Sequence, residues 1–222
     1  MEMTVSVIIP AYQAEKYIAQ AVRSVRQQRW DGRIEIIVVD DGSTDQTSQK
    51  AEELGVTLLR KEQGGAAAAR NMGMQAAAGE LIMLLDADDV LTDNALSDMY
   101  AAMAENGVSA VFAMAEDFIS PELTAAEQAA LKPRTAPYGG VLPGCSLIRR
   151  QVFDTIGYFD STLKSGETVA WQMQLRESRI PTVQIPTVTL KRRLHMTNTG
   201  RLHQKQEMAN YAALLRKRMK KQ

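Results

Sequence analysis

The feature of this chain that most limits its fold is a set of short apolar segments, each ending abruptly in a polar turn. Residues 5–9, 34–39 and 81–85 are almost wholly apolar, and the turns after them are Pro-Ala-Tyr, Asp-Asp-Gly-Ser and Asp-Ala-Asp-Asp. Apolar runs of this length are typical of strands that are buried on both faces. Because segments with helical spacing separate them, the sequence predicts a mostly parallel α/β sheet with helices on both faces.

The same patterns predict the remaining elements. In the first half we expect helices after residues 17 and 45, and over 65–78 and 93–106, with strands at 56–59 and 108–113. Gly79 and Gly107 are the expected stops of the last two helices. In the second half we expect helices at 122–131, 151–156 and 167–178, and strands at 141–148 and 183–190. We therefore expect one domain with halves at 1–113 and 114–200, followed by a basic C-terminal helix within 201–222.

Charge is distributed unevenly along the chain. The 26 basic and 26 acidic residues balance, which argues against a nucleic-acid-binding protein. Residues 191–222 nevertheless carry ten Lys or Arg and one Glu, a local charge of +9. Within 204–221 these cations accompany an apolar stripe at helical spacing, which we expect to pack on the domain. The alternative is peripheral contact of this segment with an anionic membrane surface or a partner protein.

Cysteine usage and hydropathy bear on the compartment. Cys145 is the only cysteine, so no intrachain disulfide forms, and we interpret it as a small buried side chain because no base partner is apparent. The longest apolar run is far below the ~20 residues that cross a bilayer. The N-terminal residues also lack a signal-peptide pattern. We expect a cytoplasmic protein, with a peripheral position at the inner membrane face as the alternative.

Two acidic clusters follow equivalent strand ends. Asp40 and Asp41 end one predicted strand, and Asp86, Asp88 and Asp89 end another. Ligands of parallel sheets bind beyond these ends, and carboxylates that lie close together repel each other unless a cation joins them. Mn²⁺ or Mg²⁺ takes oxygen ligands and leaves positions open for phosphate oxygens. The alternative is that each cluster caps the helix that follows it.

Four ordered sequence blocks resemble the family 2 inverting glycosyltransferases, which have the Rossmann-like GT-A fold. The blocks are SVIIPAY (6–12), VVDDGSTD (38–45), AARN (68–71) and LDADD (85–89). The likeness is strongest over residues 4–92 and continues more weakly to about residue 198. It implies that the chain transfers a sugar, with inversion and metal assistance, from a nucleotide diphosphate donor to an acceptor. The acceptor is left open between a glycan, a lipid and a peptide.

The resemblance assigns a nucleotide pocket to the first half. Pro10, Ala11 and Tyr12 would line this pocket, and Asp41 or its neighbour Asp40 would hydrogen-bond the base. A carboxylate that accepts a hydrogen bond from a pyrimidine ring N–H favours uracil or thymine. A UDP- or dTDP-sugar is therefore the expected donor.

The resemblance also implies a diphosphate and metal site. Arg70 would lie near the nucleotide, Asp86 would contact the ribose, and Asp88 would hold the metal that bridges the diphosphate and neutralises its charge. For Arg70 the alternative is an ion pair with a carboxylate at the edge of the core. In the second half, Arg192 and Arg193 would contact the diphosphate, because guanidinium groups match phosphate oxygens. His195 would reach back to the metal, with a structural role as its alternative.

An inverting transfer needs a base that takes the acceptor proton, and the matching stretch is Ser-Gly-Glu-Thr-Val-Ala-Trp over residues 165–171. Many relatives have a second acid where Thr168 stands, and often another where Ala170 stands. Glu167 is the only carboxylate in the motif and is our candidate base, with a helix N-terminal role as the alternative. Trp171 could stack on a sugar, although core packing is the usual role of such a residue and is expected for Phe159.

Two rival functions remain. Thr168 and Ala170 favour a non-catalytic nucleotide-sugar-binding or scaffold module. The second rival is a sugar-nucleotide nucleotidyltransferase, which would have a glycine-rich loop where this chain has Pro10-Ala11-Tyr12. A nicotinamide-dependent dehydrogenase is disfavoured, because no Gly-x-Gly-x-x-Gly follows the first strand.

Overall fold

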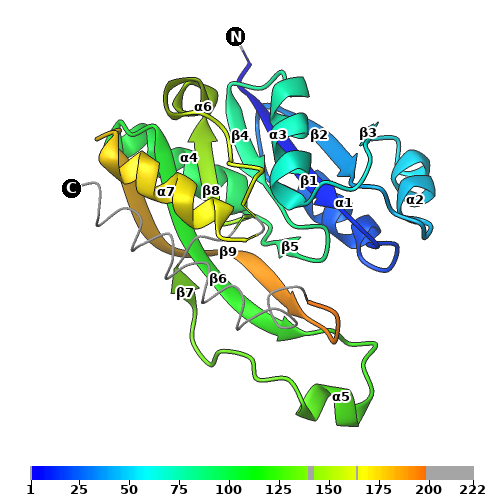
Figure 1. Cartoon of the computed structure of the whole chain (residues 1–222). Helices are drawn as coiled ribbons and strands as arrows, with labels where there is room; N and C mark the ends of the chain where they lie inside the picture. The colour runs from blue at the N-terminus through cyan, green and yellow to red at the C-terminus, as the bar shows by residue number, and fades with distance from the viewer. Residues whose placement is uncertain (1, 140–142, 164, 199–222) are drawn as a thin grey trace.

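Nine strands form one mixed sheet in the computed structural model, which describes residues 2–139, 143–163 and 165–198 (Figure 1). The strands are β1 (Thr4–Ala11), β2 (Arg33–Asp40), β3 (Thr57–Arg60), β4 (Leu81–Leu84), β5 (Val90–Leu91), β6 (Ala110–Ile119), β7 (Tyr138–Gly139), β8 (Ser146–Arg149) and β9 (Thr182–Leu194). Their order is β3-β2-β1-β4-β8-β6-β9-β5, and β7 pairs with β6. The fold is the GT-A-like α/β fold that the sequence predicts.

Seven helices lie within the described residues. They are α1 (Ile18–Arg26), α2 (Thr47–Glu53), α3 (Ala66–Ala76), α4 (Ala95–Asn106), α5 (Ala125–Ala129), α6 (Arg150–Ile156) and α7 (Glu167–Glu177). None of these described helices has the length and apolar character of a bilayer span. The basic helix expected over 204–220 lies outside the described residues.

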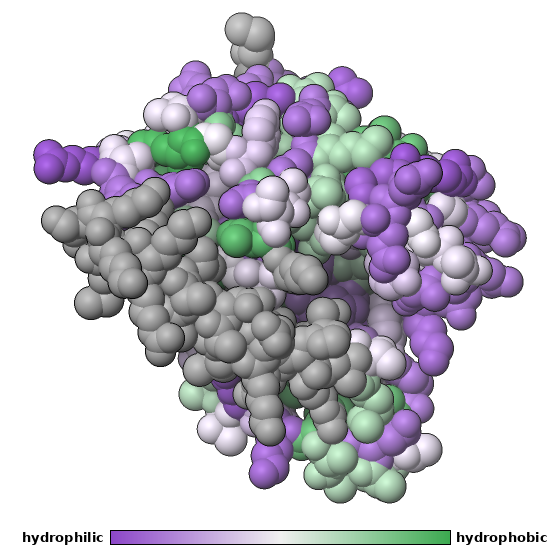
Figure 2. Space-filling model, viewed as in Figure 1, coloured by the Kyte–Doolittle hydropathy of each residue, from purple (hydrophilic) through white to green (hydrophobic). Residues whose placement is uncertain are grey.

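The two faces of the sheet carry separate layers of the core. Val5, Val7 and Ile9 of β1 pack in the cluster that contains α1 and α4, whereas Ile8 packs in the cluster that contains α3, α6 and α7. Successive side chains of a strand point to opposite faces, so a strand covered on both faces is apolar at most positions, and the buried Ser6 of β1 is accommodated by its hydrogen bond to Glu35. On the face shown in Figure 2, apolar side chains of the described residues form only small separate patches.

The first four strands along the chain are parallel, and β8 changes the pattern. β1 pairs in parallel with β2 and β4, and β2 pairs in parallel with β3. β8 lies antiparallel between β4 and β6, so β6 and its parallel neighbour β9 run in the same direction as β4. The carboxyl ends of these strands therefore point toward the same edge of the sheet.

The strands β6 and β9 are longer than the sequence predicts. β6 continues past residue 113, where we placed the boundary between the halves, and β9 continues to Leu194. Their outer ends pair Glu116 with Lys191 and Asp117 with Arg192, and opposite charges across two strands stabilise the pairing. Charged positions of this kind interrupt the apolar run, and so the hydrophobic pattern underestimates the length of the strand.

Gly107 and Gly79 were predicted to end two helices, and the structure confirms only the prediction for Gly107. Gly107 ends α4 in the left-handed conformation with φ 61°, as expected. α3, in contrast, ends at Ala76, and the extended residue Ala77 follows it. A Cβ at Gly79 would lie 2.7 Å from the Ser6 nitrogen, so this glycine allows close backbone packing against β1 rather than stopping the helix.

Candidate functional site

The ends of β1, β2 and β4 bring the predicted nucleotide residues together at one edge of the sheet. Ala11 pairs with Asp40 across β1 and β2, and the Asp41 nitrogen donates to the Ala11 carbonyl at 2.8 Å. Ala11 is buried, whereas Tyr12 is 49% exposed and is the only exposed large hydrophobic residue among those described. An exposed aromatic ring at a strand end is available for contact with a ligand.

Asp40 and Asp41 both organise the loops around this edge. The Ser43 nitrogen donates to Asp40 Oδ1 at 2.9 Å, and the Ser48 hydroxyl donates to Oδ2. Asp40 thus holds the turn after β2, and it does not cap α2, whose N-cap residue is Gln46 and has no side-chain cap hydrogen bond.

Asp41 instead holds the loop before α3. Its oxygens accept from Lys61 Nζ at 2.6 Å and from the backbone nitrogens of Gly64 and Gly65 at 2.9 and 2.7 Å. An ionised carboxylate has about four acceptor positions. Asp41 therefore retains the capacity for one further donor, such as a base N–H.

Arg70 joins the two halves of the chain. Its Nη2 lies 2.9 Å from Asp86 Oδ1, and its Nη1 lies 2.8 Å from Glu167 Oε1. Burial alone would lower the pKa of Arg70, but the carboxylates of Asp86 and Glu167 raise it. The structure therefore shows the ion pair that was the alternative for Arg70, and the buried Nε atom has no hydrogen-bond partner among the described residues.

Asp88 and His195 form a second junction. His195 Nε2 lies 2.9 Å from Asp88 Oδ2, and Asn198 Nδ2 lies 3.2 Å from the same oxygen. The Thr197 hydroxyl lies 2.9 Å from Nδ1 and orients the ring, and the Tyr17 ring packs beside it with centroids 4.8 Å apart. An oxygen and a neutral imidazole nitrogen are both suitable ligands for Mn²⁺.

The acidic turn itself offers few further metal ligands. Asp89 is 5% exposed, and burial raises its pKa well above the usual range, with Asp88 and Asp86 adding to the effect. No group of three or more His, Cys, Asp or Glu side chains that could hold a metal occurs within the described residues. A metal at this point would have two ligands from the protein, Asp88 and His195, and would take its remaining ligands from a diphosphate and water.

Arg193 is buried inside this junction, with 2% of its surface exposed. Its backbone nitrogen donates to Asp89 Oδ1 at 2.9 Å, and its Nε donates to the Asp88 carbonyl at 2.7 Å. Its two Nη atoms donate to the Ser120 hydroxyl and the Gln20 side chain at 3.1 and 2.5 Å. The guanidinium thus holds the acidic turn against α1 and β6.

Arg192 lies on the other face of β9, as neighbouring strand residues must. Its Nη1 is 3.9 Å from Asp117 Oδ1. Burial opposes a rise in the Arg192 pKa, but the hydroxyl of Tyr138 and nearby carboxylates raise it. The sequence analysis expected Arg192 and Arg193 to contact the same diphosphate. Because their side chains point to opposite faces of β9, they do not converge on one diphosphate.

Glu167 begins α7 after Gly166, which has φ 81°. Trp171, one turn later, is 3% exposed, stacks on Phe153 with centroids 4.8 Å apart, and donates its Nε1–H to the Gly157 carbonyl at 2.8 Å. The aromatic side chains Trp171 and Phe159 therefore belong to the core. Cys145 is also completely buried, and burial raises its pKa to about 12.

Two asparagines in this region were not predicted to have roles. Asn71 donates to the Phe159 carbonyl at 2.8 Å and accepts from the Phe159 nitrogen at 3.1 Å, which fixes the loop before α7. Asn198 accepts from the His195 nitrogen at 2.7 Å. The sequence signal for Asn71 was its place directly after Arg70 in the third block, whereas nothing in the sequence distinguished Asn198.

Comparison with known proteins identifies similar chains. The model of the family described as Glycosyl transferase family 2 matches residues 6–157. Glycosyltransferase GlyG of Streptococcus pneumoniae is 27% identical over an alignment of 205 residues that covers 81% of this chain and 68% of GlyG. The poly(ribitol-phosphate) beta-N-acetylglucosaminyltransferase TarS of Staphylococcus aureus is 37% identical over an alignment of 111 residues that covers 47% of this chain but only 19% of TarS.

Solved structures show the same fold. The crystal structure of TarS residues 1–349 in complex with UDP-GlcNAc is similar with a TM-score of 0.71 and 25% identity, over 88% of this chain and 60% of that one. A longer TarS structure gives a TM-score of 0.70, and this chain covers 37% of it. The chain thus spans only part of TarS.

Proposed function

This chain belongs to glycosyl transferase family 2, and on that premise we propose that it transfers a sugar with inversion from a UDP- or dTDP-sugar to an acceptor. The observation that carries the proposal is the convergence of Asp88 and His195, which are 107 residues apart, to 2.9 Å beyond the end of β4. Arg70, Asp86 and Glu167 form a continuous polar cluster beside this edge. The similarity to TarS, whose structure contains UDP-GlcNAc, makes a UDP-sugar the first donor to test.

Asp88 and His195 would hold Mn²⁺ or Mg²⁺, which when bound neutralises the negative charge on the departing diphosphate. Arg193 would hold the acidic turn in place, since it binds the Asp88 carbonyl and the Asp89 carboxylate. Tyr12 and the remaining acceptor capacity of Asp41 would serve the base of the donor. The protein thus supplies the binding and orientation of the nucleotide.

Glu167 would act as the base. The acceptor hydroxyl oxygen would form a bond to the anomeric carbon while the bond to the diphosphate breaks on the opposite face, and Glu167 would take the hydroxyl proton. Arg70 binds Oε1 of this carboxylate at 2.8 Å and thereby fixes its orientation. Glu167 lies in the first turn of α7, and Arg70 links it to Asp86 of the acidic turn at the sheet edge.

A non-catalytic nucleotide-sugar-binding module is the second candidate, and one observation favours it. Glu167 is the only carboxylate in the first turn of α7, and it is ion-paired with Arg70. Arg70 therefore already occupies Oε1, one of the two oxygens with which this carboxylate could take a proton. Thr168 stands where the family resemblance implies a second acid.

The test is a binding and transfer screen with Mn²⁺ over UDP-, dTDP- and GDP-sugars. We expect metal-dependent binding of one donor, loss of that binding in Asp88→Asn, and loss of transfer with retained donor binding in Glu167→Gln. Asp154→Asn, which changes an exposed carboxylate of α6, is the matched control and should behave as wild type. Donor binding without transfer to any acceptor extract, unchanged by Glu167→Gln, would favour the binding module.

A further inference from the structure

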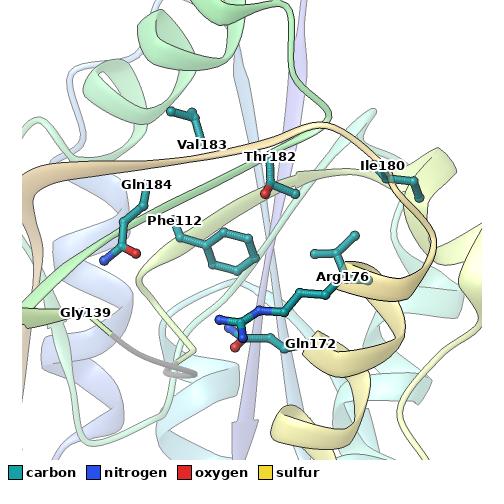
Figure 3. Close-up of a pocket in the computed structure, with 9 residues that line it drawn as sticks. Phe112, Gly139, Gln172, Arg176, Ile180, Thr182, Val183 and Gln184 are labelled. Atoms are coloured by element: carbon teal, nitrogen blue, oxygen red, sulfur yellow. The ribbon is translucent and has the colours of Figure 1, made fainter. Parts of the chain in front are cut away.

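A cavity of about 540 Å³ lies between α7, β6 and β9. Figure 3 shows Gln172 and Arg176 extending from α7 toward Phe112 of β6, with Thr182 and Gln184 of β9 on the opposite side. The cavity contains neither the acidic turn nor the nucleotide edge described above. None of its described lining residues belongs to the candidate site above.

The cavity is aligned with the catalytic end of α7. Thr168, Gln172 and Arg176 are spaced by four residues and therefore form one row along the helix. With a rise of 1.5 Å per residue, Gln172 lies about 6 Å and Arg176 about 12 Å along the axis from Thr168. Thr168 and Glu167 both lie in the first turn of α7, on helix faces about 100° apart, so the row begins in the same helical turn as the candidate base and leads from there to the cavity.

The side chains that line the cavity match a polyhydroxylated anion. Arg176 is exposed and supplies a planar guanidinium, which pairs with the two oxygens of a phosphate or carboxylate. The amides of Gln172 and Gln184 can donate to and accept from hydroxyl groups. None of the described residues that line the cavity is Asp or Glu, so no negative charge opposes an anion there.

We propose that this cavity binds the part of the acceptor distal to the reacting hydroxyl, and that the acceptor is a hydroxyl-rich chain bearing phosphate or carboxylate groups. This assignment rests on the proposed transferase function, because it names the acceptor class of the same enzyme. Gln172 and Arg176 then determine acceptor specificity, while the donor is bound at the sheet edge.

The experiment measures binding of oligomers to the 222-residue chain by calorimetry without any donor sugar. The probes are a ribitol-phosphate oligomer, a galacturonate oligomer and an uncharged dextran oligosaccharide of similar length. The variants are Arg176→Gln, Arg176→Lys and the matched control Arg23→Gln, which removes an exposed arginine of α1. Melting temperature and UDP affinity establish that each variant is folded.

We expect at least one anionic oligomer to bind wild type more tightly than dextran does, and less tightly as salt increases. Arg176→Gln should weaken this binding about ten- to a hundredfold, the effect of losing a charge-assisted hydrogen bond. The affinity of Arg176→Lys for the oligomer should lie between those of wild type and Arg176→Gln, because lysine keeps the charge but lacks the planar guanidinium. Arg23→Gln should bind the oligomer as wild type does. The two anionic probes distinguish a phosphate-bearing from a carboxylate-bearing acceptor.

Equal binding of dextran and the anionic oligomers, no binding of either, or binding that Arg176→Gln leaves unchanged would overturn the proposal. Because the assay contains no donor, it is independent of catalysis. If the oligomer binds through Arg176 but wild type transfers no sugar from any donor, the catalytic proposal fails and the binding site stands.

Discussion

Arg70 and Glu167 lie 97 positions apart in the sequence, yet they form an ion pair in which Nη1 is 2.8 Å from Oε1. The other terminal nitrogen of Arg70 binds Asp86 of the acidic turn. One buried guanidinium therefore connects the donor side of the site to the candidate base. A substitution of Asp86 should therefore alter the position of Glu167, and a substitution of Glu167 should alter that of Asp86.

The first prediction concerns the stability of this bridge. Arg70→Met should lower the free energy of unfolding by about 3 kcal/mol, because it leaves the carboxylates of Glu167 and Asp86 without their partner. The side chain of Glu167 is only 15% exposed, whereas that of Asp86 is 35% exposed, so the loss should lie at the low end for buried pairs. Urea denaturation measures it.

Arg60→Met is the matched control for Arg70→Met. Arg60 pairs with Glu52, and both side chains are more than half exposed. Surface pairs of this kind contribute at most about 1 kcal/mol. An equal loss of stability in the two variants would contradict the view that Arg70 is a structural bridge.

The second prediction concerns metal dependence. His195→Gln should weaken Mn²⁺-dependent UDP binding at least about tenfold and leave metal-free binding unchanged, because one of the two protein ligands is lost. Thr197→Val, which removes the partner of Nδ1, should weaken Mn²⁺-dependent UDP binding less than His195→Gln does, because it removes a group that orients the ligand and leaves the ligand itself in place. Titration of UDP with and without Mn²⁺ checks both variants. Wild-type affinity that is insensitive to Mn²⁺ would exclude this role.

The sequence was sufficient for the first half of the fold because apolar runs and polar turns coincide there. β1, β2 and β4 are buried on both faces, so each appears as an almost wholly apolar run, interrupted only by Ser6 in β1 and Glu35 in β2, and their ends carry the motif residues. The two-residue strands β5 and β7 are too short for any periodic signal. They exist because β9 and β6 provide edges with which they pair.

The sequence predicted which residues gather at the site better than it predicted which groups their side chains contact. Asp88 and His195 were expected near one metal, and they do lie together. The family resemblance placed Arg70 near the nucleotide, and Arg193 was assigned to the diphosphate because guanidinium groups match phosphate oxygens, but both are buried against protein acceptors. Sequence cannot distinguish these uses, since the same guanidinium geometry suits a carboxylate, a carbonyl and a phosphate. Only the tertiary contacts decide between them.

The third prediction concerns Cys145. Burial raises its pKa to about 12, compared with about 8.5 in an unfolded chain. At pH 8.5 about half of the unfolded thiols are ionised but only about one in three thousand of the folded ones. Thiol reagents should therefore modify the protein only when denaturant is added. Because the folded pKa is the higher one, this group should also reduce stability as the pH rises from about 8.5 toward 12. Rapid labelling of the native protein would contradict the burial.

The fourth prediction separates the two neighbouring arginines of β9. Arg193→Lys should weaken UDP binding in Mn²⁺ about tenfold or more, because an ammonium cannot reach the Asp88 carbonyl, Ser120 and Gln20 together as the guanidinium does. Arg192→Lys keeps a cation near Asp117 on the opposite face and should change UDP affinity less than about threefold. If Arg193 only stabilised the fold, Arg193→Lys would lower the melting temperature without this shift in affinity. If both arginines bound the diphosphate directly, the two variants would lose affinity equally.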